Sequence, residues 1–210
     1  MDESFKKKLG ISVIIICCSV IFSCQSDTKQ VKNCFNEYKE AIINHDGNEA
    51  INYIDTNSKN YYSNILEKVK DLDSFQLEQE PVLQKLTILR IRYRFPKEEI
   101  LKMNGQTLLI SLINKGMTNN GNIANSTLGK ITINNNLAKA EKIVKNKKTP
   151  IVFLFHKEND SWKIGMNLSS VFDIVLKQML LDSGMPENDF LFKLLDSISS
   201  IKPFRKFGSL

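Results

Sequence analysis

Residues 149–168 read TPIVFLFHKENDSWKIGMNL, and this stretch decides the fold. The continuous apolar run Ile151–Phe155 is typical of a central strand that is covered on both faces. After a turn at Glu158–Ser161, apolar side chains recur at every second position, as in a strand with one buried face. These positions are Trp162, Ile164, Met166 and Leu168. The stretch therefore predicts an antiparallel hairpin.

Two segments before this hairpin predict two further strands. Apolar and polar residues alternate over 128–133 and again over 137–144, and three consecutive asparagines separate the two segments at Asn134–Asn136. Asparagine is a frequent turn residue, because it tolerates left-handed backbone conformations. Neighbouring strands with such short connections predict a four-stranded antiparallel meander.

The chain before the strands has helical periodicity. An amphipathic helix is predicted from Val31, with Thr28 as its N-cap and Gly47 as its stop. A short second helix is expected over 48–55, and a third from Ser58 onward. The apolar stripe of the first helix comprises Val31, Cys34, Phe35, Tyr38, Ala41 and Ile42, and ends near His45.

Residues 86–95 fit two patterns. Ile91, Tyr93 and Phe95 alternate with Arg90, Arg92 and Arg94, as in a strand. A longer apolar stripe that begins after Pro81 fits a helix, and a helix is favoured because Pro96 forces a boundary only at its far end. The three arginines would then sweep around the helix instead of forming one anion-binding face. The helical region 81–116 is expected to break at Asn104–Gly105 and to end at Gly116.

Helices followed by a sheet predict the α+β class, and here a resemblance can be named. The opening helix contains C-F-x-E-Y-x-E-A-I, and the last hairpin contains H-K-E-N-D-S-W-K-I-G-M. Over residues 31–70 and 127–168 the chain resembles the NTF2-like superfamily. The resemblance implies a cone, in which N-terminal helices pack on a curved four-stranded antiparallel sheet. The predicted domain covers 31–200.

Two segments depart from this pattern. The helical insert 81–116 is one, and the C-terminal helices within 169–199 are the other. The insert and the C-terminal helices would cap or fill the cone. The basic and aromatic residues of 201–210 can lie on an anionic membrane surface. A flexible tail is predicted instead, because the ends of a chain are usually loosely held.

The N-terminus resembles a bacterial lipoprotein signal. Lysines at positions 6 to 8 precede the uncharged run Leu9–Phe22, which is shorter than the roughly 20 residues of a membrane-spanning helix. Ile21, Phe22 and Ser23 then precede Cys24 in the arrangement of a lipobox. The resemblance implies a signal peptide over 1–23, lipidation of Cys24 and a tether over 24–30. The protein is therefore expected in the bacterial cell envelope, facing the periplasm or the outside.

Composition indicates one domain and argues against nucleic acid as a partner. The chain has 210 residues, of which 42% are hydrophobic and 25% charged, as in globular proteins. Its net charge is +6, but 25 of its 29 basic residues are lysine and only four are arginine. Nucleic-acid sites favour arginines concentrated on one face. Without residues 1–23, Cys34 would be the remaining free thiol, so no internal disulfide is expected.

The sequence contains no motif for a metal, a cofactor or a nucleophilic serine. Only His45 and His156 are histidines, and H-x-x-x-H, C-x-x-C, phosphate-loop and G-x-S-x-G patterns are absent. No cofactor or metal is predicted. The resemblance implies that cone-shaped relatives sometimes perform isomerase or dehydratase chemistry with a carboxylate or histidine beside a tyrosine. Catalytic candidates on that basis are Tyr38, Asp55 and His156, together with His45 and Tyr53, although each also has a structural role open to it.

Three functions follow as hypotheses. The first is a lipid-anchored envelope protein whose water-exposed domain binds a small apolar ligand or an envelope protein. The second is an enzyme that uses the same cavity. The third is a structural envelope subunit whose cone is filled by its own side chains. The structure can distinguish the three hypotheses. An open apolar pocket supports binding, a converging pair of ionisable groups supports catalysis, and a filled core supports the structural role.

Overall fold

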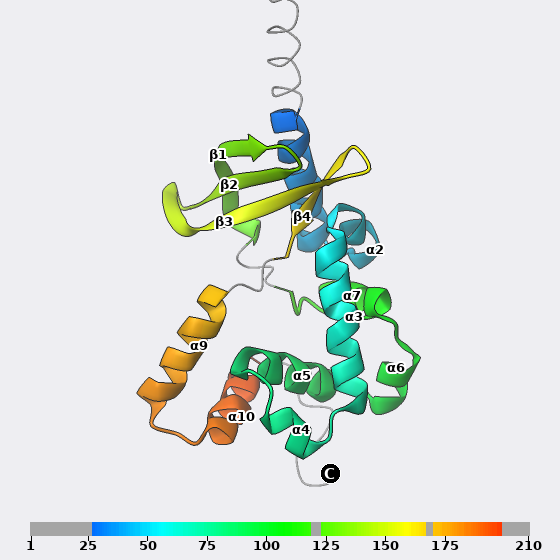
Figure 1. Ribbon diagram of the computed structural model, residues 1–210, viewed down its shortest axis with the longest axis vertical. Coiled ribbons are helices and arrows are strands. Elements are labelled where there is room, and N and C mark those ends of the chain that lie inside the picture. The colour runs from blue at the N-terminus through cyan, green and yellow to red at the C-terminus, as the bar shows by residue number, and fades with distance from the viewer. Residues whose placement is uncertain (1–26, 119–122, 167–169, 199–210) are drawn as a thin grey trace, which may run out of the picture. The chain divides into compact units, whose positions relative to one another are not determined.

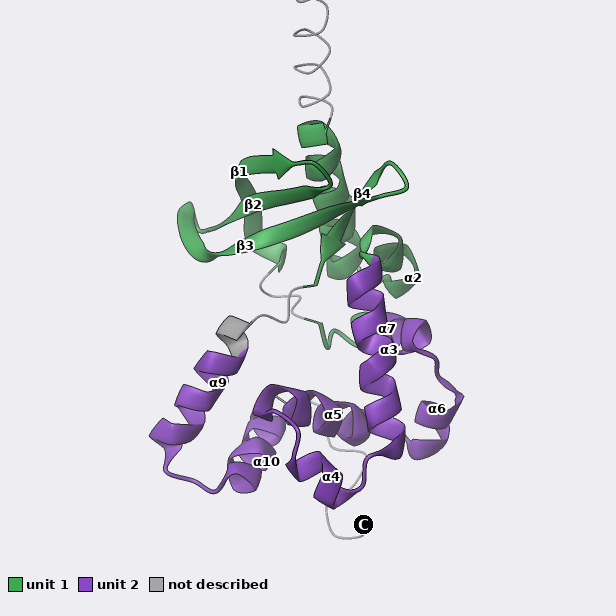
Figure 2. Ribbon diagram, in the orientation of Figure 1, with its two compact units in different colours: residues 1–55, 113–166 green, residues 56–112, 167–210 purple. Residues whose placement is uncertain are grey.

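The computed structural model describes residues 27–118, 123–166 and 170–198, and it combines helices with one four-stranded antiparallel sheet (Figure 1). The predicted α+β class is confirmed. The chain divides into two compact units, each formed by two separate segments (Figure 2). Unit 1 comprises Met1–Asp55 and Ile113–Met166, and unit 2 comprises Thr56–Leu112 and Asn167–Leu210.

The sheet of unit 1 is a meander with the order β1-β2-β3-β4. The four predicted strands are confirmed, with shifted ends at β1, β3 and β4. Strand β4 ends at Gly165, so Met166 is not part of it, and Leu168 lies outside the described residues. Asn135 and Asn159 occupy turns with φ of 51° and 48°, left-handed values that asparagine tolerates. The strands are β1 (Ser126–Asn134), β2 (Leu137–Val144), β3 (Lys147–Glu158) and β4 (Ser161–Gly165).

One face of this sheet is closed and the other is partly open. Phe155 pairs with Ala138 on one side and Ile164 on the other, and all three are buried. On the opposite face Val152 remains 37% exposed and Leu154 is half-buried. The prediction that β3 is covered on both faces is therefore wrong: its apolar run reflects an interior position within the sheet.

The N-terminal helix of the described chain covers residues 27–43 and packs on the closed face. Its Phe35 ring lies 5.0 Å from the ring of Phe153. Asp27 is already helical, so Thr28 is not the N-cap, and residues 27–30 of the predicted tether belong to the helix. The backbone of His45 takes a left-handed conformation after the helix, with φ of 56°.

Gly47 begins the next helix instead of stopping the first one. Helix α2 (Gly47–Ala50) starts there, because the Asp46 side chain accepts a hydrogen bond from the backbone nitrogen of Glu49 at 3.0 Å. The 3-10 helix η1 (Ile51–Tyr53) follows directly. The predicted short helix over 48–55 is thus two short helical turns.

Unit 2 is built from helices, and the helical interpretation of residues 86–95 is confirmed up to Arg94. Helix α5 contacts α3, α9 and α10, and its Ile88 and Ile91 are buried. The predicted break at Asn104–Gly105 is also confirmed. Besides α7 (Gly105–Asn114), whose last two residues fall in unit 1, the helices are α3 (Thr56–Asp71), α4 (Ser74–Glu78), α5 (Val82–Arg94), α6 (Lys97–Lys102), α9 (Ser170–Ser183) and α10 (Glu187–Ile198).

Polar side chains of α5 connect the helices of unit 2. Arg92 donates to the backbone oxygens of Val69 and Leu72 at the C-terminal end of α3, where carbonyl groups lack helical partners. The buried Lys85 ammonium lies 2.5 Å from the Glu187 carboxylate of α10. Arg92 and Lys85 thus tie α5 to two other helices of unit 2, α3 and α10.

Helix α7 begins where it approaches α3 too closely for a side chain. A Cβ atom at Gly105 would lie 2.6 Å from the Ser63 Cα atom. We expect Gly105→Ala to lower the free energy of unfolding by about 1–3 kcal/mol, because one of the two helices must shift. Urea denaturation measures the change. Gln106→Ala, at the next and exposed position, is the control, and an equal effect of both variants would contradict the prediction.

Candidate functional site

Asp55 reaches the sheet through a short backbone pairing at its free edge. Ile54 forms a parallel bridge with Ile164 of β4, and the Asp55 backbone nitrogen donates to the Ile164 oxygen at 3.0 Å. Strand β4 is the last strand of the sheet, so its outer edge is open to such pairing. Asp55 is therefore placed beside the partly open face of the sheet.

His156 meets Asp55 on this face. Its Nδ1 atom lies 2.7 Å from Asp55 Oδ2, although the two residues are 101 positions apart in the chain. The Asp55 side chain is 2% exposed and that of His156 is 34% exposed. An ionised carboxylate only accepts hydrogen bonds, so Nδ1 carries the proton and donates it. The second ring nitrogen, Nε2, is then free to act as an acceptor when the ring is neutral.

Gly165 leaves room for this pair. A Cβ atom at position 165 would lie 3.2 Å from Asp55 Oδ2 and 3.8 Å from His156 Cε1. Lys163, which pairs directly with His156 across the strands, donates its ammonium to the Asn52 backbone oxygen at 2.6 Å. Lys163 thus holds η1 to the sheet edge next to the pair.

The other sequence candidates lie elsewhere. Tyr38 is buried in the core on helix 27–43. The Tyr53 hydroxyl donates to Glu49 Oε1 at 2.6 Å, and this hydrogen bond is the main reason that the pKa of Tyr53 is raised to about 12. His45 lies at the end of helix 27–43, with Nδ1 3.4 Å from the Ile113 oxygen. The structure therefore brings together Asp55 and His156, and Cys24 lies outside the described residues.

An oriented histidine needs a reacting partner, and the thiol of Cys34 is not one. Cys34 is buried, and its sulfur lies 3.9 Å from the Tyr53 backbone oxygen. Burial raises the pKa of this thiol to about 12, so it stays protonated at neutral pH. In the Asp55–His156 pair the carboxylate orients an imidazole ring that can act as a general base, and Cys34 supplies no nucleophile for it.

Residues 27–118, 123–166 and 170–198 contain no group of three or more His, Cys, Asp or Glu side chains that could hold a metal ion. Over the same ranges, none of the helices has the length and hydrophobicity needed to cross a bilayer.

Helix α9 exposes large apolar side chains that sequence reasoning did not single out. Leu181 is 73% exposed and Ile174 is 65% exposed, while Leu176 faces the interior of unit 2. The signal was present in the sequence, because apolar residues occur around the whole circumference of this helix. We call these exposed side chains the α9 apolar face. It consists of two stripes, Ile174 with Leu181 and Val175 with Met179, and the hydrogen-bonded pair Gln178 and Asp182 lies between them.

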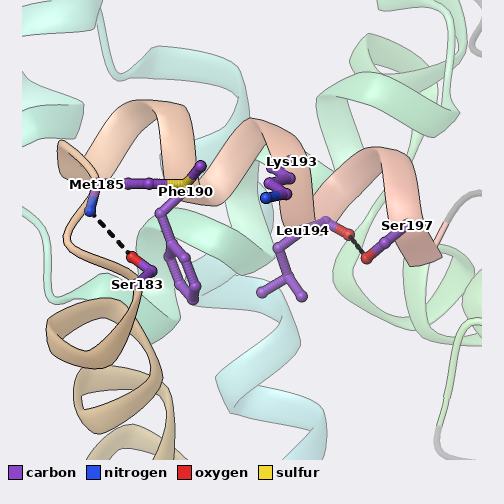
Figure 3. Close-up of a pocket in the computed structure, with 6 residues that line it drawn as sticks. All are labelled: Ser183, Met185, Phe190, Lys193, Leu194 and Ser197. Atoms are coloured by element: carbon purple, nitrogen blue, oxygen red, sulfur yellow. Dashed lines mark hydrogen bonds between the residues drawn. The ribbon is translucent and has the colours of Figure 1, made fainter.

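A shallow cavity adjoins the connection from α9 to α10. Its volume is about 210 Å³, and Met185, Phe190 and Leu194 supply its apolar walls (Figure 3). Ser183 Oγ accepts a hydrogen bond from the Met185 backbone nitrogen at 3.2 Å, which shapes the connection. Pockets for small ligands usually measure about 300–1,000 Å³, so this cavity is small for one.

Comparison with family models, curated proteins and solved structures found no match for this chain.

His156 supplies a hydrogen bond to a carboxylate that has almost no access to water. We expect His156→Ala to lower the free energy of unfolding by about 1–2 kcal/mol, because Asp55 loses a donor while remaining buried. Lys139→Ala, an exposed residue on the same sheet face, should change it by less than about 0.5 kcal/mol. Urea denaturation of both variants measures the difference. Equal stabilities would show that the pair contributes nothing to folding.

Proposed function

We propose that this protein is a lipid-anchored component of the bacterial cell envelope whose water-exposed domain binds a partner protein. The α9 apolar face is the observation that carries the binding part of this proposal. Burying a large apolar side chain contributes roughly 1.5–3 kcal/mol, so four such side chains left in water favour association. Exposed large apolar side chains gathered on one helix mark interaction sites in soluble proteins.

A partner protein fits this surface better than a small ligand. The α9 apolar face is convex, since it lies on the outside of one helix, and the adjoining cavity of about 210 Å³ is shallow. Small ligands need a concave site that buries most of their surface. A groove in a partner that accepts side chains at helical spacing would cover Ile174 and Leu181, which are seven positions apart and share one stripe of the helix.

The lipid anchor is supported by the order of features at the N-terminus. A charge-free run of fourteen residues, Leu9–Phe22, leads to Cys24, and only three residues later Asp27 belongs to a folded helix. Two acyl chains give stable membrane attachment without a protein segment in the bilayer. The described chain can then fold in water.

We propose that unit 1 has the NTF2-like architecture that the sequence resembles. In support, helix 27–43 packs on one face of a four-stranded meander, and the strand that contains Trp162 is the last of the sheet. In such a cone the sheet would be curved and wrapped by the N-terminal helices.

A second candidate function is favoured by the Asp55–His156 pair. Two ionisable groups converge at 2.7 Å, and the carboxylate orients the ring as in catalytic acid–base pairs. The alternative function is therefore an enzyme of isomerase or dehydratase type. A buried hydrogen-bonded pair also stabilises a fold without any catalysis, and for this reason partner binding is the preferred function.

The anchor is tested by labelling the protein with fatty acid in a bacterial host. We expect the label in the wild-type protein and in Cys18→Ser, and its complete loss in Cys24→Ser, because only the Cys24 sulfur would form the thioether. Gel fluorography measures incorporation. Lipid uptake by Cys24→Ser, or an intact leader without added lipid mass, would contradict the anchor.

Partner binding is tested with a photoreactive amino acid at Leu181 in the lipidated protein on its native membrane. We expect a defined heavier adduct at Leu181 and none at Phe75, an isolated apolar side chain of unit 2 with almost the same exposure, 72% against 73%. Adding Ile174→Asp should abolish the Leu181 adduct, because a charge opposes burial of the face. No adduct at Leu181, or equal adducts at both positions, would argue for a structural role instead.

A further inference from the structure

Asp27 joins the N-terminal helix to one end of the sheet. Its Oδ1 atom accepts hydrogen bonds from Lys157 Nζ at 2.9 Å and from Trp162 Nε1 at 3.1 Å. Lys157 and Trp162 are cross-strand neighbours on either side of the Asn159–Asp160 turn. The hydrogen bond from Lys157 is the main reason that the pKa of Asp27 is lowered, so its carboxylate is ionised at neutral pH. The start of the described chain is thereby held beside the β3–β4 turn.

The β1–β2 turn lies at the same end. The backbone nitrogen of Lys157 donates to the Asn136 oxygen at 2.8 Å, which places that turn next to β3. We call this region the Asp27 end of unit 1. It consists of Asp27, Lys29, Asn135, Asn136 and residues 157–162.

Covalent geometry limits the distance between the Asp27 end and Cys24. Asp27 lies three positions after Cys24, and a fully extended chain spans at most about 3.6 Å per residue, or about 11 Å in total. The opposite end of the sheet carries the β2–β3 turn at Lys145–Asn146. Strand β3 has 12 residues, so at about 3.3 Å per residue the two ends are separated by roughly 35–40 Å.

We propose that the Asp27 end is the membrane-facing surface of unit 1 and that it rests against lipid headgroups, an inference that depends on the lipidation of Cys24 proposed above. The acyl chains enter the bilayer at Cys24, so the Asp27 end stays within about 11 Å of the membrane surface. The β2–β3 turn lies too far from Asp27 to contact the membrane in its stead. The β2–β3 turn then points away from the membrane.

The composition of the Asp27 end suits a headgroup surface. Asn135, Asn136, Asn159 and Asp160 are exposed and polar, and the charges of Asp27 and Lys157 compensate each other. None of the residues that make up this end is an exposed large apolar side chain that would insert between lipids. Lys29 and Lys157 offset all but one of the negative charges of Asp27, Glu158 and Asp160. The lipid anchor therefore provides the affinity, and the short connection provides the orientation.

The orientation is tested with the full lipidated protein in phosphatidylcholine vesicles that contain headgroup-spin-labelled lipid. A fluorophore is attached to Asn159→Cys or, as the matched control, to Asn146→Cys. Both asparagines sit in two-residue turns with left-handed backbones, with φ of 48° and 60°, so substitution strains both alike. Cys34 does not compete for the label, because it is buried and burial raises its thiol pKa to about 12.

We expect several-fold stronger quenching of the Asn159→Cys label than of the Asn146→Cys label. A flexible Gly/Ser linker of about 20 residues before Asp27, with a root-mean-square span of about 25 Å, should remove most of this difference. Equal quenching at both positions, or stronger quenching at position 146, would overturn the orientation.

Vesicle flotation separates the failure of the anchor from the failure of the orientation. Protein that floats with the vesicles but shows equal quenching retains the anchor and refutes the orientation. Protein that does not float, and whose mass lacks a lipid, refutes the anchor and the orientation with it. A difference in quenching that persists with the long linker would show that unit 1 binds lipid through its own surface. That result would contradict the proposal that the short connection to Cys24 sets the orientation.

Discussion

The parallel bridge between Ile54 and Ile164 is the constraint on which the candidate site depends. It adds one short stretch of backbone to the free edge of β4, and it carries the chain from the N-terminal helices of unit 1 to the partly open sheet face. Asp55 follows the bridge directly, so its carboxylate reaches His156. The bridge also occupies an edge that would otherwise offer unpaired backbone groups to other chains.

The two units differ in where they leave apolar side chains in water. In unit 1 the closed sheet face is covered by helix 27–43, and the Asp27 end is polar. In unit 2 the core around α5 is filled, yet α9 presents apolar side chains outward as well as inward. A helix that is apolar around its whole circumference is normally buried on all sides. The asymmetry gives unit 2 the binding surface and unit 1 the connection to the membrane in the function that we propose.

Much of the local structure could be predicted, because it depends on periodicity within a few residues. Alternation located the strands, and the helical stripe after Pro81 correctly favoured a helix over a strand at 86–95. The errors concern features that distant residues decide. Thr28 is not a cap because Asp27 is already helical and is held by Lys157 and Trp162, more than a hundred positions away. The apolar run Ile151–Phe155 did not reveal that only one face of β3 is closed. The hydrophobicity of a strand does not indicate whether another element packs on each of its faces.

The sequence by itself determined the α+β class, the order of the strands and the residue types of the candidate pair, because backbone preferences and side-chain alternation act locally. It also determined how short the connection from Cys24 to the folded chain is, which is a matter of counting residues. Only the tertiary structure decided that Asp55 meets His156, that Tyr53 turns instead to Glu49, and that the α9 apolar face remains in water. The meeting of Asp55 and His156 depends on which residues folding brings together across 101 positions, and local pattern carries no information about such a pairing. Tyr53 and Glu49 are four positions apart, but only the fold shows that the Tyr53 hydroxyl takes this local partner and stays away from Asp55 and His156. The exposure of α9 depends on which elements pack against it.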